Sequence, residues 1–598
     1  MRKIAKTGLG IATLLFMLAS CATMPKKPEN LTRGDYDSTK EYITRLIKEG
    51  IKRQNVTGLS IALVDDQRVV WAEGFGFADA AKKMPAMPET IYRAGSISKL
   101  FTATAVMQLV EQGKLDIDQP LRHYLPEFTV KSRFPNAGPI TPRTIMTHHS
   151  GLPSNYARGM WTQTTPEPFE NLVEQIKDEY VANPPNHIFS YSNLGVTLLG
   201  CALERVTGQA YGSYMDASVL SPLGMTHSSF SQGPDHSPLA AKAYRKGAEA
   251  EEPALRDLPA GGLNTNVLDL SRFMQMVFAA GRADERQIIK PETLAEMLRP
   301  QNADVPLDLD IRIGLAWMLG DAALQNGGPV ASHGGATCHH RSQLIVLPEH
   351  KLGIVVLANS STSGSVVNKV ATEALKLALE AKTGIKQPAG KKTELPSEVT
   401  VPREELLTYE GRYETLEGVV DVGLESNYLQ TEVMNKTLRL VPRADNRFYL
   451  QYKLMGLIPF SLGGLGNIGI SHAMIDGHDI LKACINGREI LAGERIQAIE
   501  IPEKWLERTG KYEIVNRGND ALILDNLHLR HDKGLLRVDY SLPLFSKNTI
   551  TLALEPISDS EAIIYGLGRG KGETIRVVKE GGKALLHYSG YLFRKKLE

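Results

Sequence analysis

Apolar and polar positions along residues 36–384 alternate in blocks that predict a mixed α and β region. Two β-hairpins are predicted, each from two short apolar runs around a polar turn: 58–64 with 68–72, and 343–347 with 353–358. Between them, residues 99–112 have helical periodicity that ends at Gly113, and a second helix is predicted over 366–379. Strands at both ends with helices between them predict one sheet, built from the N- and C-terminal segments and covered by helices.

The pattern changes after residue 384. Residues 385–400 include a Pro, Gly and Lys-rich run and are predicted to be a linker. Beyond them the chain has short β-rich runs, frequent turns and hardly any helical periodicity. Two stretches match one another: Val401-Pro402 with Tyr409 to Glu414, and Ile501-Pro502 with Arg508 to Glu513. We therefore predict two homologous β-domains, 401–500 and 501–598, although chance similarity of so short a motif is the alternative.

The first twenty residues have the layout of a targeting segment, with a basic start and an apolar stretch over 8–19 that is too short to span a bilayer comfortably. The stretch ends in Leu18-Ala19-Ser20-Cys21, which resembles the bacterial lipobox. Residues 1–20 are then a lipoprotein signal peptide, Cys21 is acylated, and 21–35 form a polar tether. Ala22 in place of Asp favours the outer membrane, facing the periplasm or the cell surface. A plain secretory signal is the alternative.

Composition narrows the possible partners. The 68 Lys and Arg residues against 67 Asp and Glu residues leave a net charge of +1, so nucleic-acid binding has no electrostatic support. Apart from Cys21, the cysteines Cys201, Cys338 and Cys484 are widely spaced and contain no CxxC pair. We predict buried apolar side chains for them rather than a disulfide framework or a metal site. No metal or other cofactor is expected.

The first motif with chemical meaning is Ser96-Ile97-Ser98-Lys99, at the start of the predicted helix. This spacing places the Ser96 hydroxyl and the Lys99 amine on one helical face. Free N–H groups at a helix N-terminus favour an oxyanion, and a desolvated neutral lysine can take the proton of a serine hydroxyl. The Ser-x-x-Lys pattern alone is common, and a capping serine with an exposed lysine is its ordinary explanation.

The second motif is Tyr191-Ser192-Asn193. A tyrosine beside a lysine can share its proton and pass it to a leaving group. Asn193 could bind a substrate amide. Taken alone, the stretch is also explained by a polar turn.

The third motif is Ser332 to Ala336, directly before the second hairpin. It contains His333, Gly334 and Gly335, and two glycines on a strand edge let a substrate backbone approach closely. In this arrangement the N–H of Ala336 would join that of Ser96 in an oxyanion hole.

In this order, the three motifs resemble those of the serine β-lactamase/DD-peptidase superfamily, in particular its class C-like branch. Further matching stretches are 116–118, 145–153, 258–263 and 347–354, and the resemblance spans about residues 42–382. It implies an α+β fold with an antiparallel sheet flanked by helices, and an acyl-enzyme mechanism. It assigns catalysis to Ser96, Lys99 and Tyr191, and substrate binding to Asn193, His333, Gly334, Gly335 and Ala336. D-aminopeptidases of this superfamily have a similar layout, with a catalytic domain and two β-barrels.

Three departures limit what the resemblance transfers. His333 stands where the family often has the Lys of Lys-Thr-Gly. A histidine at this place is typical of D-aminopeptidases and esterase-like hydrolases. Because it is only partly cationic at neutral pH, a histidine holds a β-lactam carboxylate less well than a lysine does. Cys338-His339-His340 replaces the usual Pro-Gly-aromatic run, and we expect altered substrate contacts there rather than a metal site. His149 replaces a small hydroxyl residue, and its role is open.

Residues 464–469 match G-x-G-x-x-G but open no predicted helix, so we reject nucleotide binding. The surrounding apolar stretch, 454–470, is predicted to be a buried strand and turn. A sharper hypothesis is a loop of the first β-domain that lines the catalytic cleft, in which case deleting 457–468 changes substrate preference.

The predicted protein is a lipid-anchored serine hydrolase of the bacterial cell envelope. Its expected substrates are D-amino-acid-containing peptides or peptidoglycan-related molecules, cut at an amide or ester bond. The alternatives are a carboxylesterase, a weak β-lactamase, or a binding scaffold without activity. The sequence leaves open whether Lys99 or Tyr191 is the principal base, and it does not predict the oligomeric state.

Overall fold

The computed structural model describes residues 27–320, 324–388, 395–416, 418–433, 436–454, 458–460, 466–497, 499–521, 524–544 and 549–597. The predicted signal peptide, Cys21 and the start of the tether therefore lie outside the described residues.

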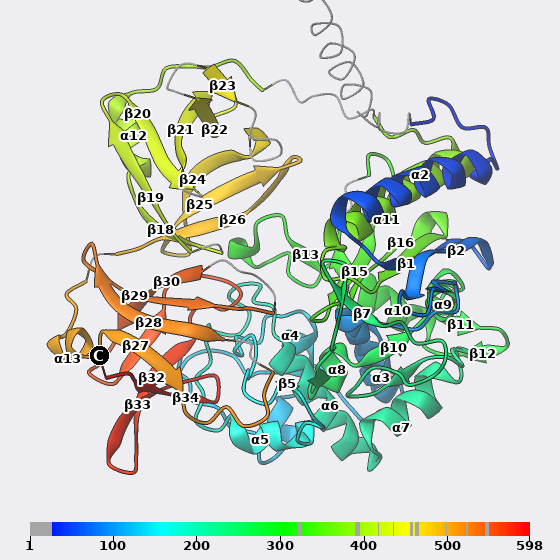
Figure 1. Cartoon of the computed structure of the whole chain (residues 1–598), viewed down its shortest axis with the longest axis horizontal. Helices are drawn as coiled ribbons and strands as arrows, with labels where there is room; N and C mark the ends of the chain where they lie inside the picture. The colour runs from blue at the N-terminus through cyan, green and yellow to red at the C-terminus, as the bar shows by residue number, and fades with distance from the viewer. Residues whose placement is uncertain are drawn as a thin grey trace, which may run out of the picture.

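The N-terminal domain is built around an antiparallel sheet in the order β13-β14-β15-β16-β17-β1-β2-β3 (Figure 1). Its strands are β1 (Gly58–Asp65), β2 (Arg68–Asp79), β3 (Met84–Pro85), β13 (Arg312–Ile313), β14 (Met318–Leu319), β15 (Ala331–Ala336), β16 (Arg341–Leu347) and β17 (Leu352–Ala358). Strand β1 pairs with β17, with Leu59 opposite Ala358, so the first and last long strands of the domain lie side by side. The two predicted hairpins and the shared sheet are confirmed.

Helices cover both faces of this sheet. On one face α2 (Tyr36–Gln54) and α11 (Gly364–Thr383) lie side by side, and their apolar residues pack with those of β1 and β17 in one buried cluster (Figure 1). The other face carries α3 (Ser98–Glu111), α6 (Asn193–Thr207) and α9 (Val267–Phe278). Shorter elements complete the domain: α4 (Pro142–Met146), α5 (Leu172–Gln175), α7 (Tyr211–Met215), α8 (Leu258–Gly261), α10 (Pro291–Leu298), β4 (Tyr92–Arg93), β5 (Trp161–Thr162), β6 (Ser229–Phe230), β7 (Ala243–Arg245), β8 (Ala248–Ala250), β9 (Ala254–Leu255), β10 (Leu263–Thr265), β11 (Arg282–Ala283) and β12 (Arg286–Gln287).

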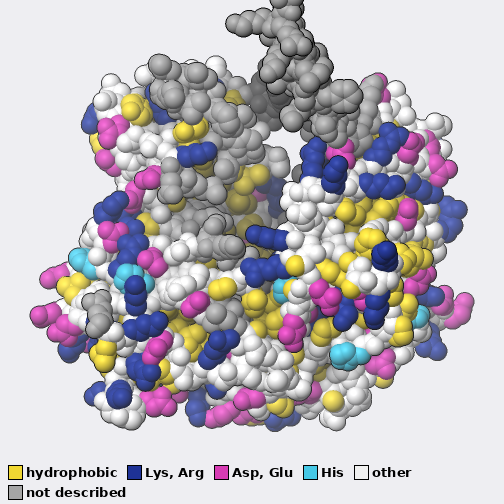
Figure 2. Space-filling model, viewed as in Figure 1, with side chains coloured by type: hydrophobic (Ala, Val, Ile, Leu, Met, Phe, Trp, Pro, Cys, Tyr) yellow, Lys and Arg dark blue, Asp and Glu magenta, His cyan; other side chains and the backbone are white. Residues whose placement is uncertain are grey.

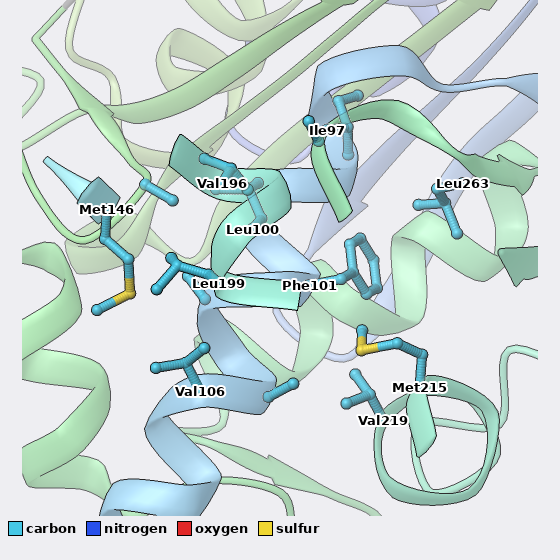
Figure 3. Packing of buried hydrophobic residues seen from close by; sticks show 14 of the residues in the cluster. Ile97, Leu100, Phe101, Val106, Met146, Val196, Leu199, Met215, Val219 and Leu263 are labelled. Atoms are coloured by element: carbon cyan, nitrogen blue, oxygen red, sulfur yellow. The ribbon is translucent and has the colours of Figure 1, made fainter. Parts of the chain in front are cut away.

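Helix α3 is the most deeply buried helix of the domain's core. Its side chains are buried on every face from Ser98 to Met107, as expected for a helix enclosed by other elements rather than one at the surface. Figure 3 shows Leu100, Phe101 and Val106 among side chains from α6 and neighbouring elements. The prediction of a helix here is confirmed, and the chain leaves it at Gly113, whose φ of 68° favours glycine.

Two β-barrels follow, so the predicted fold class is confirmed. The first has a short helix, α12 (Arg403–Tyr409), and the strands β18 (Gly411–Thr415), β19 (Gly418–Glu425), β20 (Tyr428–Val433), β21 (Lys436–Arg443), β22 (Arg447–Leu454), β23 (Ile458–Phe460), β24 (Gly469–Ile475), β25 (His478–Ile485) and β26 (Arg488–Arg495). Pairing of β21 with β22 and of β18 with β26 closes the ring, and β23 is appended to β22.

The second barrel begins with α13 (Glu503–Glu507). Its strands form a closed ring: β27 (Gly510–Ile514), β28 (Asp525–Asp532), β29 (Leu535–Ser541), β30 (Thr549–Pro556), β31 (Glu561–Ile564), β32 (Thr574–Glu580), β33 (Lys583–Tyr588) and β34 (Tyr591–Lys595).

The two barrels open with the same local structure. In each, a helical turn leads into a strand that starts at glycine, Gly411 or Gly510. Two residues later a buried tyrosine turns its hydroxyl back to the carbonyl four residues before it. The Tyr413 hydroxyl donates to the carbonyl of Tyr409 (3.0 Å), and the Tyr512 hydroxyl donates to that of Arg508 (2.7 Å). The repeated sequence motif thus forms the same packing unit twice.

Both barrels contact the N-terminal domain. From the second barrel, Arg576 pairs with Glu179 (3.2 Å) and Glu561 pairs with Arg133 (2.8 Å). From the first, the Arg488 guanidinium donates to the carbonyl of Gly320 (2.7 Å). The second barrel therefore lies against the half of the domain that contains α4 to α6 (Figure 1).

Over the described residues, no helix has the length and apolar character needed to cross a membrane. On the face shown in Figure 2, Lys and Arg side chains are interspersed with Asp and Glu rather than gathered in one patch.

A buried ion pair joins the two barrels. Lys571 Nζ lies 2.5 Å from Glu414 Oε1, both side chains are almost fully buried, and burial raises the pKa of Glu414 although the lysine lies beside it. Glu414 Oε2 also accepts a hydrogen bond from the Ala553 N–H (2.9 Å). A carboxylate in such a place depends on its partner cation.

We predict that Lys571→Met lowers the free energy of unfolding by about 3–5 kcal/mol, because it leaves the Glu414 carboxylate buried and unpaired. Urea titration checks this. The matched control is Lys579→Met at an exposed position of β32, which should change stability by less than about 0.5 kcal/mol. Equal effects of the two substitutions would contradict the assignment.

Candidate active site

Ser96 lies in a tight 3₁₀ turn, Gly95–Ile97, that leads directly into α3. Gly95 has a φ of 56°, which favours glycine. Ser98 fixes the turn, because its hydroxyl donates to the Gly95 carbonyl (2.6 Å) and accepts from the N–H of Leu263 in β10 (3.0 Å). The Ser96 side chain is half-buried, so its hydroxyl can meet a substrate.

Strand β15 runs against this turn. A Cβ on Gly95 would lie 2.7 Å from the Ala336 nitrogen, and one on Gly335 would lie 2.0 Å from the Ala94 carbonyl oxygen. Only glycine at both positions allows the two backbones to lie so close. The backbone of Ala336 therefore lies beside the Ser96 turn, where an oxyanion hole needs it. Strand β14 pairs with β15 only at Ala331 and Ser332.

Lys99 lies beneath Ser96 and is almost fully buried. Its Nζ is 3.3 Å from Ser96 Oγ, 2.8 Å from Asn193 Oδ1 and 2.7 Å from the carbonyl oxygen of Ala260 in α8. A neutral amine has two N–H groups and one lone pair. The two oxygen acceptors take the N–H groups, so the lone pair is left for the Ser96 hydroxyl.

The electrostatics favour that neutral form. Burial holds the pKa of Lys99 well below 10.5, and the positive charge of Arg569 lowers it further, whereas Asp257 opposes the shift. Asp257 is itself paired with Arg256 (2.7 Å), and burial raises its own pKa.

Tyr191 lies over the Lys99 amine, with its ring centroid 4.9 Å from Nζ. Burial raises the pKa of its hydroxyl to about 12, although a hydrogen bond with Ser96 and the charge of Arg569 act in the opposite direction. The hydroxyl is therefore protonated at neutral pH. The ring packs against His148 at a centroid distance of 4.0 Å.

Asn193 is held by a chain of hydrogen bonds that begins in the second barrel. Its Nδ2 donates to Asn155 Oδ1 (2.8 Å), which turns Oδ1 of Asn193 toward Lys99. The neighbouring Ser154 N–H donates to Glu573 Oε1 (2.8 Å), and Ser154 Oγ accepts from the Gly570 N–H (2.8 Å). The orientation of Asn193 thus depends on contacts that the second barrel makes.

His333 is buried, and burial lowers its pKa to about 4. The ring is neutral at pH 7, with Nδ1 donating to the carbonyl of Gly334 (2.6 Å). Its Nε2 is then an acceptor that has no partner in the described part of the chain. Strand β15 therefore presents no positive charge at this position.

The structure brings Ser96, Lys99, Tyr191, Asn193 and Ala336 together at the mouth of α3, with His333, Gly334 and Gly335 along the adjoining strand. Cys21 lies outside the described residues.

Two departures noted in the sequence have structural partners. Cys338, His339 and His340 are buried, as Lys99 and His333 of the site are, so burial does not contradict the expectation of altered substrate contacts, which stays a prediction. The backbone N–H and Nδ1 of His339 both lie within 3.0 Å of Glu252 Oε2, and His340 lies beside the same carboxylate. These histidines therefore pair with a buried acidic residue that the motif itself does not contain.

His149, whose role was open, is also structural. Its Nε2 pairs with the buried Asp308 (2.7 Å), which in turn accepts from the N–H of Phe189 (2.6 Å). This pair fixes the loop that leads to Tyr191.

Residues 457 and 461–465 of the loop hypothesised for the first β-domain, 457–468, lie outside the described residues, so that hypothesis stays a prediction. A loop of the second barrel, residues 566–572, reaches the site: the Arg569 guanidinium lies 4.9 Å from the centroid of the Tyr191 ring. The signal for it in the sequence was the run Gly566-Leu-Gly-Arg-Gly-Lys-Gly572, which alternates glycine with other residues between two strands.

Nothing in the described residues suggests a metal. No group of three or more His, Cys, Asp or Glu side chains in them could hold one. The cysteines Cys201, Cys338 and Cys484 are free thiols.

Comparison with known proteins fits this geometry. Protein flp of Staphylococcus aureus (strain N315) is 26% identical over 333 residues, 55% of this chain and 64% of that protein, so the match spans less than two thirds of the relative. A putative penicillin-binding protein, PbpX of Bacillus subtilis (strain 168), is 29% identical over 218 residues, 36% of this chain and 53% of PbpX.

Among solved structures, the octameric penicillin-binding protein homologue from Pyrococcus abyssi aligns with a TM-score of 0.50 and 25% identity, over 76% of this chain and all of that one. The family model described as Beta-lactamase matches residues 43–379, more than half of the chain. These residues include every side chain assembled around Ser96 except Arg569 and the barrel contacts. The chain belongs to the Beta-lactamase family, whose members are serine hydrolases.

Proposed function

We propose that the protein cuts amide or ester bonds through an acyl-enzyme on Ser96, with D-amino-acid-containing peptides or peptidoglycan-related molecules as substrates. The observation that carries the proposal is the state of Lys99. Its amine is buried, holds a lowered pKa and directs two N–H groups to Asn193 and Ala260, so its lone pair is available to the Ser96 hydroxyl.

In the first step Ser96 Oγ attacks the substrate carbonyl carbon and its proton passes to Lys99 Nζ. The carbonyl oxygen becomes an oxyanion, which the N–H groups of Ser96 and Ala336 stabilise. The bond to the leaving nitrogen or oxygen then breaks. Tyr191 gives that atom its proton and regains one from the Lys99 ammonium. Water attacks the carbonyl of the resulting ester and passes a proton to Lys99, and the Lys99 ammonium gives this proton to Ser96 Oγ as the ester bond breaks.

This scheme divides the acid and base roles between two residues. With a pKa of about 12, the Tyr191 hydroxyl is protonated at neutral pH and is suited to act as the acid. Lys99, with a lowered pKa, is suited to act as the base. These two pKa shifts support Lys99 as the principal base.

A β-lactamase is the less favoured alternative, since the neutral His333 cannot pair with a β-lactam carboxylate as a lysine does. A carboxylesterase shares the same acyl-enzyme chemistry and differs only in the leaving group. A scaffold without activity does not account for a lysine that is buried beside a half-buried serine.

The location is a second part of the proposal. The lipobox-like sequence at Cys21 supports an acylated protein of the bacterial cell envelope, anchored in the outer membrane and facing the periplasm or the cell surface.

We predict that wild-type protein is labelled by a fluorophosphonate probe and that Ser96→Ala abolishes the label, because the probe needs an activated serine. The matched control is Ser221→Ala, at an exposed serine of the same domain that makes no contact with the Ser96 turn; it should keep labelling. Absence of label on the folded wild type with both a fluorophosphonate and a labelled penicillin would favour the scaffold. Product release from D-peptides, esters and β-lactams then separates the enzyme classes.

The pH profile gives a second test. Only neutral Lys99 can accept the serine proton, so kcat/KM rises with pH, and its midpoint lies well below 10.5 because burial lowers the pKa. Tyr191 must stay protonated. Because its pKa is about 12, any loss of kcat/KM at alkaline pH should begin only above pH 10.5. Measuring kcat/KM for a neutral ester across this range checks both limbs. A midpoint near the ordinary lysine value would contradict the assignment of Lys99 as base.

For the anchor, we predict that wild-type protein made in a bacterial host incorporates a fatty-acid label and sediments with membranes, whereas Cys21→Ser does neither. Cys484→Ser, at a half-buried thiol, is the matched control and should behave as wild type. Label on the Cys21→Ser protein would overturn the lipoprotein proposal.

A further inference from the structure

The strand that carries Ala336 ends in a tight turn. Ala336 is the last residue of β15 and pairs with Arg341, the first residue of β16, so residues 337–340 form the turn between the two strands. Two hydrogen bonds close this turn: the Thr337 N–H donates to the carbonyl of His340 (3.1 Å), and the His340 N–H donates to Thr337 Oγ1 (3.1 Å). Because Ala336 directly precedes the turn, the placement of the turn also places its N–H.

A buried carboxylate from a segment distant in the sequence holds this turn. Glu252, which lies between β8 and β9, is 7% exposed. Its Oε2 accepts hydrogen bonds from the backbone N–H of His339 (2.9 Å) and from Nδ1 of the same residue (3.0 Å). The Nδ1 atom of His340 lies 3.7 Å from this oxygen. One carboxylate oxygen thus fixes both the backbone and the ring of His339 within the turn.

The same segment is also bound to the chain ahead of Ser96. Arg93, the last residue of β4, is 2% exposed, and its guanidinium donates to the carbonyl of Pro253 (2.9 Å), the residue after Glu252. Arg93 lies three residues before Ser96. Residues 252 and 253 therefore connect the chain before one N–H of the proposed oxyanion hole with the turn after the other.

Glu252 is ionised in this position. Burial alone would raise its pKa, but hydrogen bonding to the two imidazoles and the charge of Arg93 together hold the pKa well below 4.5. An ionised carboxylate only accepts hydrogen bonds, and those it accepts are stronger than bonds between neutral groups. If an apolar group replaced the carboxylate, the two His339 donors would remain buried without an acceptor. The turn would then lose the contacts that fix it.

We propose that Glu252 is a positioning residue for the oxyanion hole, because through His339 it fixes the turn that follows Ala336. The Ala336 N–H then lies where it can bind the oxyanion together with the Ser96 N–H. This inference rests on the proposed acyl-enzyme function. Glu252 acts through the turn and transfers no proton. His339 thereby affects the reaction through its bonds to Glu252, without the need to contact the substrate.

The test compares two esters that differ only in the atom that becomes the oxyanion: p-nitrophenyl acetate and its thiono analogue, in which sulfur replaces the carbonyl oxygen. Sulfur is a weak hydrogen-bond acceptor, so the ratio of the two kcat/KM values, oxo over thiono, measures what the oxyanion hole contributes. Glu252→Met keeps the length of the side chain but removes the strong acceptor, and should lower the ratio by about ten- to a hundredfold. Glu252→Gln keeps one acceptor oxygen and should restore part of the ratio.

The matched control is Glu251→Met, at the neighbouring exposed glutamate, which should leave the ratio at the wild-type value. A loss of folded protein lowers both kcat/KM values equally, so reduced stability alone does not change the ratio. If Glu252→Met does not fold, His339→Ala takes its place, because it removes the ring donor to Glu252 and should lower the ratio as well. An unaltered ratio in the folded variant would overturn the inference.

A second readout is inhibition by phenylboronic acid, which forms a tetrahedral adduct with a serine hydroxyl and so resembles the transition state. Its Ki should rise in Glu252→Met by about the same factor as the ratio falls, and an unchanged Ki would count against the inference. If wild type cuts neither ester in a Ser96-dependent way, the proposed function fails and the inference fails with it. If wild type cuts the oxo ester and Glu252→Met keeps the wild-type ratio, only the inference on Glu252 fails.

Discussion

The burial of one amine governs the construction of this site. A charged ammonium is costly to bury in an apolar interior, so a lysine at the position of Lys99 is held neutral and needs acceptors for its N–H groups. Those acceptors come from separate elements, the carbonyl of Ala260 in α8 and the amide of Asn193 at the start of α6. Helix α3 supports the arrangement because it is enclosed on all sides and leaves the lysine little freedom to reach water.

The same constraint explains why charge is scarce around Ser96. Burial lowers the pKa values of His148 and His333, so both rings are neutral, and the Tyr191 hydroxyl keeps its proton. Asp257 is neutralised by Arg256. The exposed guanidinium of Arg569 acts to lower the pKa values of both Lys99 and Tyr191, and no acidic side chain within the described residues pairs with it.

Local patterns were sufficient to predict the hairpins, the helix after Ser96 and the three motifs, because each of these is specified by residues close together in the sequence. They were insufficient wherever a partner comes from far away. Ser154 and Glu573 are 419 residues apart, and no periodicity relates them. The same reason explains why the sequence did not indicate the surroundings of His339, whose buried partner Glu252 lies 87 residues earlier. The glycine-rich run at 464–469 was singled out, whereas the comparable run at 566–572, which places Arg569 beside Tyr191, was not.

The hydrogen bonds from Gly570 and Glu573 to Ser154 have an evolutionary consequence. The segment from Ser154 to Asn155 is oriented jointly by the N-terminal domain and the second barrel, so neither could be exchanged by recombination without a matching change in the other. Lineages that lost or replaced this barrel would have to hold Asn193 by some other route. The effect of a substitution on one side of this contact is therefore expected to depend on the residue present on the other side.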